Sequence, residues 1–208
     1  MREQAGKFIT LEGGEGMGKS TVRKYVQSLL EEKNISYVLT REPGGTPMAE
    51  AIRQVLLQSY EEIVQPYTEL FLMFASRAQH IEGVIKPALA QGQWVISDRF
   101  TDASFAYQGG GRGIPQDHIQ ALSEWTGADI QPDLTLLLDA SAEVGQSRMR
   151  RRTKDRIEQE DLAFFERVRK MYLRLATLQP HRYRVIQADQ SLTHVKKAVA
   201  SVMEEVLS

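Results

Sequence analysis

Short apolar runs alternate with segments of helical periodicity along most of the chain. The apolar runs are rich in Ile, Val, Leu and aromatic residues, which indicates buried strands at 7–12, 35–40, 94–100, 134–139 and 183–186. The segment 19–32 predicts a helix, because apolar residues recur at the 3.6-residue spacing of one helix face: Val22, Val26, Leu29 and Leu30. Strand, helix and strand in so short a stretch form a βαβ unit. We therefore expect an α/β domain with a largely parallel sheet and right-handed crossovers.

The same periodicity predicts helices farther along the chain. They cover 47–59 (with Ile52, Val55 and Leu56 inward), 66–91, a segment opening at Ser141 and Glu143, 157–178, and a last amphipathic segment with Val195, Val199, Val202 and Val206. Three adjacent glycines within 107–113 predict a flexible turn that allows a ligand or a lid to approach closely.

The composition narrows the class of protein. A chain of 208 residues forms one ordinary domain and needs neither disulfides nor a structural metal to fold. The absence of cysteine excludes thiol catalysis and weakly favours a reducing compartment. A net charge of −1 argues against a surface that binds polyanions as a whole. The first residues lack the apolar core of a signal peptide and no run approaches the ~18 apolar residues of a membrane span, so we expect a soluble cytoplasmic protein.

The first predicted strand leads into a glycine-rich stretch that fits the pattern G-x-x-x-x-G-K-[ST]. Its sequence is Gly13-Gly14-Glu15-Gly16-Met17-Gly18-Lys19-Ser20. Strand, loop and helix in this order are the context that a phosphate-binding P-loop requires. In such a loop the backbone N–H groups converge on phosphate, Lys19 reaches the β- and γ-phosphates, and the Ser20 hydroxyl ligates Mg²⁺. The alternative is a glycine-rich turn with a solvated lysine; we favour binding of a nucleoside triphosphate.

Polar residues follow the second and third predicted strands, at the edge where open α/β sheets bind ligands. The segment 41–47 is either a Pro/Gly turn or a binding loop. At the end of the third strand, Asp98 can hold a metal-bound water and Arg99 can bind a phosphate in bidentate fashion. The alternative there is an internal ion pair that involves Asp98.

Two other places offer groups for a planar ligand. Phe74 and Arg77 lie about one helical turn apart, so the pair is either part of the core or a ring and a donor for a base. Tyr107 and Gln108 provide a ring and an amide, and an amide can bind a base edge through two hydrogen bonds. Arg53 by itself indicates only a surface arginine.

The segment 148–156 is strongly basic in a chain that is otherwise slightly acidic. Such a run is most often a solvated face. A second interpretation is a nucleic-acid patch. A third is a lid that places arginines on a transferring phosphoryl group, where such a residue contributes ~10³–10⁵ in rate.

Taken together, these segments resemble the bacterial thymidylate kinase family over nearly the whole chain. The resemblance rests on five motifs in order, which are Glu12–Thr21, Arg41–Gly44, Asp98–Phe100, Tyr107–Gly113 and Asp155–Glu160. It implies a P-loop NTPase fold of the nucleoside monophosphate kinase type, with a five-stranded parallel sheet and helices on both faces. It also implies one domain over 1–208 with a mobile lid at about 148–157. The implied reaction transfers a phosphoryl group from ATP to thymidine 5′-monophosphate (dTMP), giving dTDP and ADP, in dTTP synthesis.

The resemblance further implies roles for individual residues. Catalytic roles fall to Glu15, Lys19, Arg99 and Arg152. ATP binding falls to Gly13, Gly14, Glu15, Gly16, Met17, Gly18, Lys19, Ser20, Thr21, Arg148 and Ala188. The residues implied to bind dTMP are Glu42, Pro43, Arg53, Phe74, Arg77, Arg99, Ser104, Tyr107 and Gln108. Tyr107 is also implied to exclude a ribose 2′-hydroxyl. The chain is implied to bend at Pro43, often with a cis peptide bond. Ser20 and Asp98 are implied to bind Mg²⁺. The implied assembly is a homodimer with no nucleic-acid or membrane partner.

Two positions depart from the family pattern. The base-stacking phenylalanine usually lies four residues before the arginine matched by Arg77, where this chain has Met73; we expect the neighbouring Phe74 to face thymine. The basic segment is about one residue short, so Arg150, Arg151 and Arg152 compete for the catalytic place, and we favour Arg152.

Other functions remain as alternatives. They are a P-loop kinase for a nucleoside or another monophosphate, and a nucleic-acid-binding ATPase, which the near-zero net charge disfavours. A guanine-specific switch would need [NT]-K-x-D, and the segment 153–156 lacks the final Asp.

Overall fold

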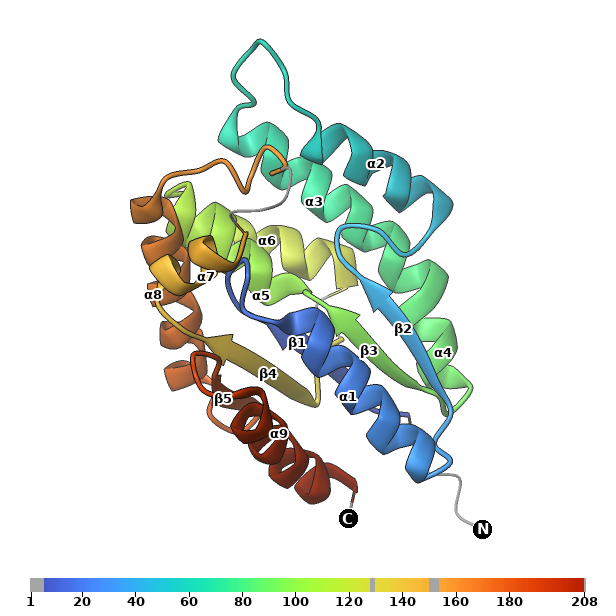
Figure 1. Ribbon diagram of the computed structural model, residues 1–208. Coiled ribbons are helices and arrows are strands. Elements are labelled where there is room, and N and C mark those ends of the chain that lie inside the picture. Colours follow the sequence, from blue (N-terminus) through green and yellow to red (C-terminus); the bar gives the residue numbers. More distant parts are fainter. Residues whose placement is uncertain (1–5, 128–129, 150–153, 208) are drawn as a thin grey trace.

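A five-stranded parallel sheet forms the centre of the molecule (Figure 1). The computed structural model describes residues 6–127, 130–149 and 154–207. In spatial order the strands are β2 (Tyr37–Arg41), β3 (Trp94–Asp98), β1 (Phe8–Glu12), β4 (Leu134–Asp139) and β5 (Tyr183–Gln187). The strands agree with the predicted runs to within about two residues at each end, and the parallel arrangement is confirmed.

Helices cover both faces of this sheet. One face carries α1 (Lys19–Glu32) and α9 (Leu192–Leu207), which lie side by side in Figure 1. The remaining described helices are α2 (Pro47–Leu57), α3 (Pro66–His80), η1 (Ile81–Ile85), α4 (Lys86–Ala90), α5 (Thr101–Ser104), η2 (Phe105–Gly111), α6 (Gln116–Gly127), α7 (Ala142–Met149) and α8 (Leu162–Leu178), where η1 and η2 are π-helical. No helix within these described residues is both long and apolar enough to cross a membrane.

The central strand shows why both faces are covered. Ile9 and Leu11 of β1 pack into the cluster built with α1 and α9, whereas Phe8 packs with η1 and α4 on the opposite face. Alternate side chains of a strand point to opposite faces, so a strand that is apolar throughout must be buried on both. All five residues of β1 are buried accordingly.

The predicted helix 66–91 is interrupted. It consists of α3, the π-helical turn η1 and the short α4. Pro87 in α4 has no N–H to donate to the carbonyl of Gly83, so the regular α-helical hydrogen-bond pattern cannot continue through this point. The apolar periodicity of the segment did not reveal this change of pitch.

The predicted flexible turn at 107–113 is wrong. Its first part lies in the π-helix η2, which packs against α8. A Cβ atom on Gly110 would lie 2.8 Å from Cβ of Met171, and one on Gly111 would lie 2.5 Å from the ring of Phe164. The glycines therefore allow α8 to approach closely, a role that we had assigned to a ligand or a lid.

Two smaller predictions need correction, and one helix was not predicted. The helix expected from residue 157 begins at Leu162, because the Asp161 side chain caps it by accepting from the Phe164 N–H at 2.6 Å. Residues 116–127 form α6, a helix that the apolar pattern did not predict. In α2, Leu56 is buried, but Val55 is 48% exposed and does not face inward.

Candidate active site

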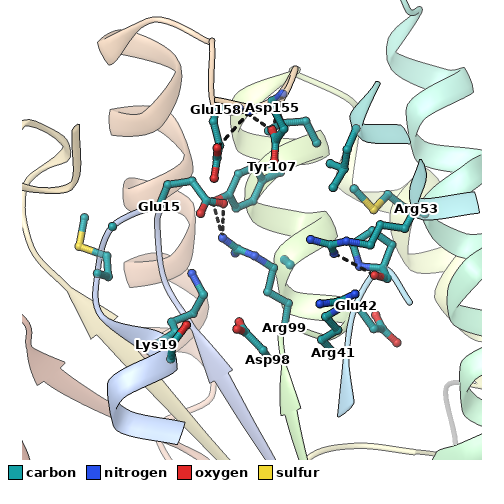
Figure 2. A pocket seen from close by; sticks show the side chains of 18 of the residues that line it. Glu15, Lys19, Arg41, Glu42, Arg53, Asp98, Arg99, Tyr107, Asp155 and Glu158 are labelled. Carbon is teal, nitrogen blue, oxygen red and sulfur yellow. Dashed lines mark hydrogen bonds and ion pairs between the residues drawn. The ribbon is translucent and has the colours of Figure 1, made fainter. Parts of the chain in front are cut away.

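The carboxyl ends of β1, β2 and β3 open onto one cavity of about 600 Å³. The P-loop follows β1, the Glu42–Pro43 bend follows β2, and Asp98 ends β3, with Arg99 directly after it. Figure 2 shows their side chains converging on this space. The cavity thus brings together segments that are far apart in the sequence, at the sheet edge where ligand binding was predicted.

The P-loop turns sharply from β1 into α1. Gly13, Gly16 and Gly18 have positive φ angles of 131°, 72° and 88°. A Cβ atom on Gly13 would lie 2.3 Å from the carbonyl oxygen of Leu138, so only glycine fits there. Nζ of Lys19 donates to the carbonyls of Gly13 (3.3 Å) and Gly14 (3.0 Å). Burial lowers the pKa of Lys19, and the nearby Arg99 charge adds to the effect.

The loop also contacts α7 through its backbone. A Cβ atom on Gly16 would lie 2.4 Å from the carbonyl oxygen of Gly145, and one on Gly145 would lie 2.3 Å from the carbonyl oxygen of Glu15. Two glycines therefore allow the first turn of α7 to lie directly against the phosphate loop.

Arg99 is the centre of a polar network at the floor of the cavity. Its φ of 74° is in the left-handed region, which a non-glycine residue adopts only when its surroundings impose it. Nη2 donates to Glu15 (2.6 Å) and the Tyr107 hydroxyl (2.8 Å), and Nη1 donates to the Gly13 carbonyl and the Tyr172 hydroxyl, both at 3.0 Å. Burial opposes the charge, but Tyr107 and Glu15 outweigh it, so the pKa of Arg99 lies well above its usual value.

Arg99 is connected through the Tyr172 hydroxyl to Glu12, which was not predicted for the site. Its carboxylate is inaccessible to solvent and accepts hydrogen bonds from the Tyr172 hydroxyl and the Phe100 N–H, both at 2.7 Å. Burial, followed by the Asp102 charge, raises the pKa of Glu12 to about 8. The connection through Tyr172 ties Arg99 to the strand β1.

A buried chain of hydrogen bonds runs behind the β2 bend. Glu42 accepts from Nε of Arg77 at 2.7 Å and from Nδ1 of His80 at 2.9 Å. Nε2 of His80 then accepts from the Thr40 hydroxyl at 2.5 Å. Arg77 also donates to Ser104 Oγ (3.0 Å) and to a backbone carbonyl (3.1 Å). His80 and Thr40 were not predicted for the site, although His80 lies one helical turn after Arg77.

The side of the cavity next to β2 is cationic. Nη1 of Arg53 donates to the Pro43 carbonyl at 2.9 Å, and the Glu42–Pro43 peptide bond is cis, as the resemblance implied. Arg41, paired with Glu50, also lines the cavity. Burial, followed by the charge of Arg41, lowers the pKa of Arg53. A concentration of guanidinium groups beside a P-loop suits a second phosphate group.

At the far end of the cavity, Arg77, Ser104, Tyr107 and Gln108 line the wall together, as expected. Phe74 does not, and this expectation is wrong. Phe74 is 2% exposed and packs in the core, with its ring centroid 4.6 Å from the Arg77 guanidinium carbon. Met73 lines the cavity instead, because one step along a helix rotates a side chain by about 100°.

The opposite end contains Arg148. Its guanidinium donates to the carbonyls of Ala188 (2.9 Å) and Gly16 (3.3 Å). Gly13, Gly14, Thr21 and Ala188 do not line the cavity themselves, whereas Gly16, Met17, Gly18, Lys19 and Ser20 do. Arg150, Arg151 and Arg152 lie outside the described residues.

The cavity also contains residues that we had not predicted for the site. Arg23, one turn after Ser20 on α1, has a buried Nε that finds no hydrogen-bond partner among the described residues. Asp155, near the end of the basic segment 148–156, and Glu158, just after it, enter from above in Figure 2. A spacing of three residues from Ser20 was the only sequence signal for Arg23.

The residues present fit a nucleotide-bound Mg²⁺ better than a resident metal. Ser20 and Asp98 both line the cavity beside Lys19. Within the described chain, no group of three or more His, Cys, Asp or Glu side chains is arranged to hold a metal ion. Mg²⁺ is commonly bound through one or two protein oxygens together with substrate phosphates, which matches this sparse set of ligands.

Comparisons with known proteins agree with this geometry. A sequence model of the family described as thymidylate kinase matches residues 11–199. Thymidylate kinases of Methylococcus capsulatus and Nitrosomonas europaea are 52% and 49% identical to the chain, covering 98% and 99% of it and 97% and 95% of their own length. The crystal structure of thymidylate kinase from Ehrlichia chaffeensis superposes with a TM-score of 0.74 at 33% identity, covering 96% of this chain and 99% of that one. The chain belongs to the thymidylate kinase family.

Proposed function

We propose that the chain transfers the γ-phosphoryl group of ATP to dTMP, giving ADP and dTDP. One observation carries the proposal: the same cavity is lined by P-loop residues, by the arginines Arg41, Arg53 and Arg99, and by Arg77, Ser104, Tyr107 and Gln108. The P-loop end suits a triphosphate, and the arginines suit the phosphate of an acceptor.

On the ATP side, we assign the phosphates to the N–H groups of the loop 13–18 and to Lys19, Ser20 and Thr21, which begin α1. Arg148 extends from α7 between Gly16 and Ala188, a position suited to stacking on the adenine. Ser20 and Asp98 would hold Mg²⁺, which, when bound, neutralises charge on the β- and γ-phosphate oxygens.

On the acceptor side, Arg53 and Arg99 would bind the 5′-phosphate next to the Glu42–Pro43 bend. The base would lie against Met73, with Arg77, Ser104 and Gln108 as hydrogen-bonding groups. Tyr107 would occupy the space beside the sugar and exclude a ribose 2′-hydroxyl. These assignments rest on the fact that the groups line the same cavity, where Arg77 and Ser104 are hydrogen-bonded to each other at 3.0 Å.

Alignment and charge neutralisation account for the rate in this proposal. The attacking phosphate oxygen is ionised at neutral pH, so no strong general base is needed. Arg99 already shares its guanidinium between Glu15 and two tyrosines. An arriving phosphate would compete with Glu15 for Nη2, which places Glu15 beside the reacting groups.

The proposal includes a lid over 148–157. Its described ends support this: Arg148 and Met149 at its start and Asp155 and Ile157 at its end all line the cavity. We assign the catalytic lid arginine to Arg152. Closure would exclude water, which otherwise hydrolyses ATP.

We also propose that two copies associate through α3 and that the enzyme acts in the cytoplasm. Tyr67 and Phe71 lie one turn apart on α3 and are 41% and 56% exposed. Apolar side chains at this spacing form a surface that a second copy would cover. Phe71→Asp should convert a dimer into monomers in sedimentation experiments; an unchanged mass would exclude this surface. Cell fractionation tests the compartment, and activity in a membrane or exported fraction would contradict it.

The function is tested by measuring ADP release with ATP and Mg²⁺ and one acceptor at a time. The acceptors are the monophosphates of thymidine, deoxyuridine, deoxycytidine and deoxyguanosine. Strong turnover with dTMP alone is the expected result. A preference for another monophosphate would overturn the assignment of the base-binding wall. ATP hydrolysis that is independent of an acceptor would overturn the kinase proposal itself.

A further inference from the structure

A buried carboxylate lies directly behind the base-binding wall. Glu69 of α3 is 1% exposed and does not line the cavity. Its Oε1 accepts from Nε2 of Gln108 at 2.8 Å. Arg112 donates to Oε1 (3.2 Å) and Oε2 (3.0 Å), and Arg156 donates to Oε2 at 2.7 Å. One carboxylate therefore contacts a residue of the proposed base site and two arginines outside it.

The two arginines keep Glu69 ionised. Burial favours the protonated carboxyl, but the hydrogen bonds and charge of Arg112 and the further hydrogen bonds outweigh it, so the pKa of Glu69 lies below its usual value. An ionised carboxylate accepts hydrogen bonds and cannot donate one. Any polar hydrogen-bonding partner of Glu69 must therefore be a donor.

This restriction fixes the orientation of the Gln108 amide. The NH₂ group must face Glu69, because the amide carbonyl would otherwise meet a carboxylate oxygen. The carbonyl oxygen of the amide then faces away from Glu69. Gln108 lines the cavity, and within the described part of the chain no hydrogen bond is made to its side-chain carbonyl.

We propose that Glu69 is a specificity-determining residue that locks Gln108 with its carbonyl oxygen toward the base. The inference rests on the proposed function, in which Gln108 contacts the base. A carbonyl oxygen that is fixed in this orientation selects a base whose facing edge carries a hydrogen-bond donor. Thymine and uracil carry N3–H, whereas N3 of cytosine is an acceptor and would face a second acceptor. Glu69 thus acts on the pyrimidine without touching it.

Glu69→Gln tests this inference in the full chain. Glutamine can both donate and accept, so the variant releases the Gln108 amide to turn over. The probes are dTMP and 5-methyl-dCMP, which differ only at N3 and at the C4 substituent. Equilibrium dialysis gives the ratio of their dissociation constants. We expect the preference for dTMP to fall about tenfold, the effect of one hydrogen bond gained by one base and lost by the other.

The matched control is Glu160→Gln. Glu160 pairs with Arg112 in the same network but makes no contact with Gln108. The control should leave the ratio unchanged. A general loosening of the network would weaken both ligands together in both variants, and an equal ratio change in the two variants would overturn the inference.

Gln108→Leu separates failure of the inference from failure of the proposed function. The ratio should fall in this variant, and adding Glu69→Gln should then have no further effect on it. If Gln108→Leu leaves the ratio unchanged, the base site is wrongly assigned. If it lowers the ratio and Glu69→Gln alone does not, the base site stands and the locking is refuted.

A measurement on the unsubstituted chain covers the case in which Glu69→Gln does not fold. With ¹⁵N-labelled dTMP bound, the N3–H proton should give a slowly exchanging resonance that is lost in Gln108→Leu. Absence of that resonance from the unsubstituted chain, or its persistence in Gln108→Leu, would overturn the inference.

Discussion

Glu42→Gln should destabilise the fold by about 3 kcal/mol. The change removes the only charge that contacts the Arg77 guanidinium within the described chain, and both side chains are almost fully buried, at 4% and 2% exposure. Leaving one partner of such a pair uncompensated typically costs about 3–5 kcal/mol. We expect the lower end, because the amide carbonyl can accept from Arg77 while its NH₂ faces His80. His80 can then move its proton to Nε2 and donate to Thr40, so every hydrogen bond is kept.

Urea unfolding followed by circular dichroism measures the loss. Glu50→Gln is the matched control, since Glu50 pairs with Arg41 at the surface, where the two side chains are 38% and 49% exposed. An exposed pair contributes at most about 1 kcal/mol. If the two variants unfold with free energies within about 1 kcal/mol of each other, burial does not amplify the Glu42–Arg77 interaction and the reasoning fails. In kinetics, Glu42→Gln should raise KM for dTMP and leave KM for ATP unchanged.

Three further outcomes follow from the polar groups of the site. Because the pKa of Glu12 is raised to about 8 in the fold, the folded chain keeps a proton that the unfolded chain releases above about pH 5. The free energy of unfolding, relative to that of Glu12→Gln, should therefore fall between about pH 5 and 8; a constant difference would contradict the shift. Tyr172→Phe should lower the free energy of unfolding by about 2 kcal/mol and reduce kcat/KM for dTMP through Arg99. Tyr60→Phe removes an exposed hydrogen bond and should lower the free energy of unfolding by under about 0.5 kcal/mol. Equal losses of stability in the two variants would refute the network. Removing Mg²⁺ with EDTA should abolish transfer from ATP, and full activity without a divalent cation would exclude the roles of Ser20 and Asp98.

The sequence was sufficient for the sheet and for the phosphate end of the site. Buried parallel strands are short continuous apolar runs, and such runs can be recognised without knowing their partners. A P-loop depends on backbone N–H groups and on glycine geometry, so a short contiguous sequence pattern is enough to predict it. The segments after β2 and β3 were also informative, because strand ends in an open α/β sheet meet at one edge.

The end of the cavity lined by Met73, Arg77 and Gln108 was less predictable, because it depends on helix phase and on pairs of residues that are distant in the sequence. Met73 and Phe74 are both apolar, and only the pitch of α3 decides which one reaches the cavity. The π-helical turns η1 and η2 have no apolar signature, and the glycines of η2 act on α8, more than fifty residues away. Buried carboxylates such as Glu12 and Glu69 look like ordinary surface residues until their partners are known.

The backbone contact between the P-loop and α7 restricts how this chain can vary through evolution. Gly145 lies in a helix, where alanine ordinarily stabilises by about 1 kcal/mol. Any side chain there would collide with the Glu15 carbonyl, and any side chain on Gly16 would collide with the Gly145 carbonyl. Neither glycine can be replaced first while the other compensates, because the obstacle in each case is backbone. Neither position can therefore be substituted one step at a time, and α7, which leads to the basic segment, must stay packed against the phosphate loop.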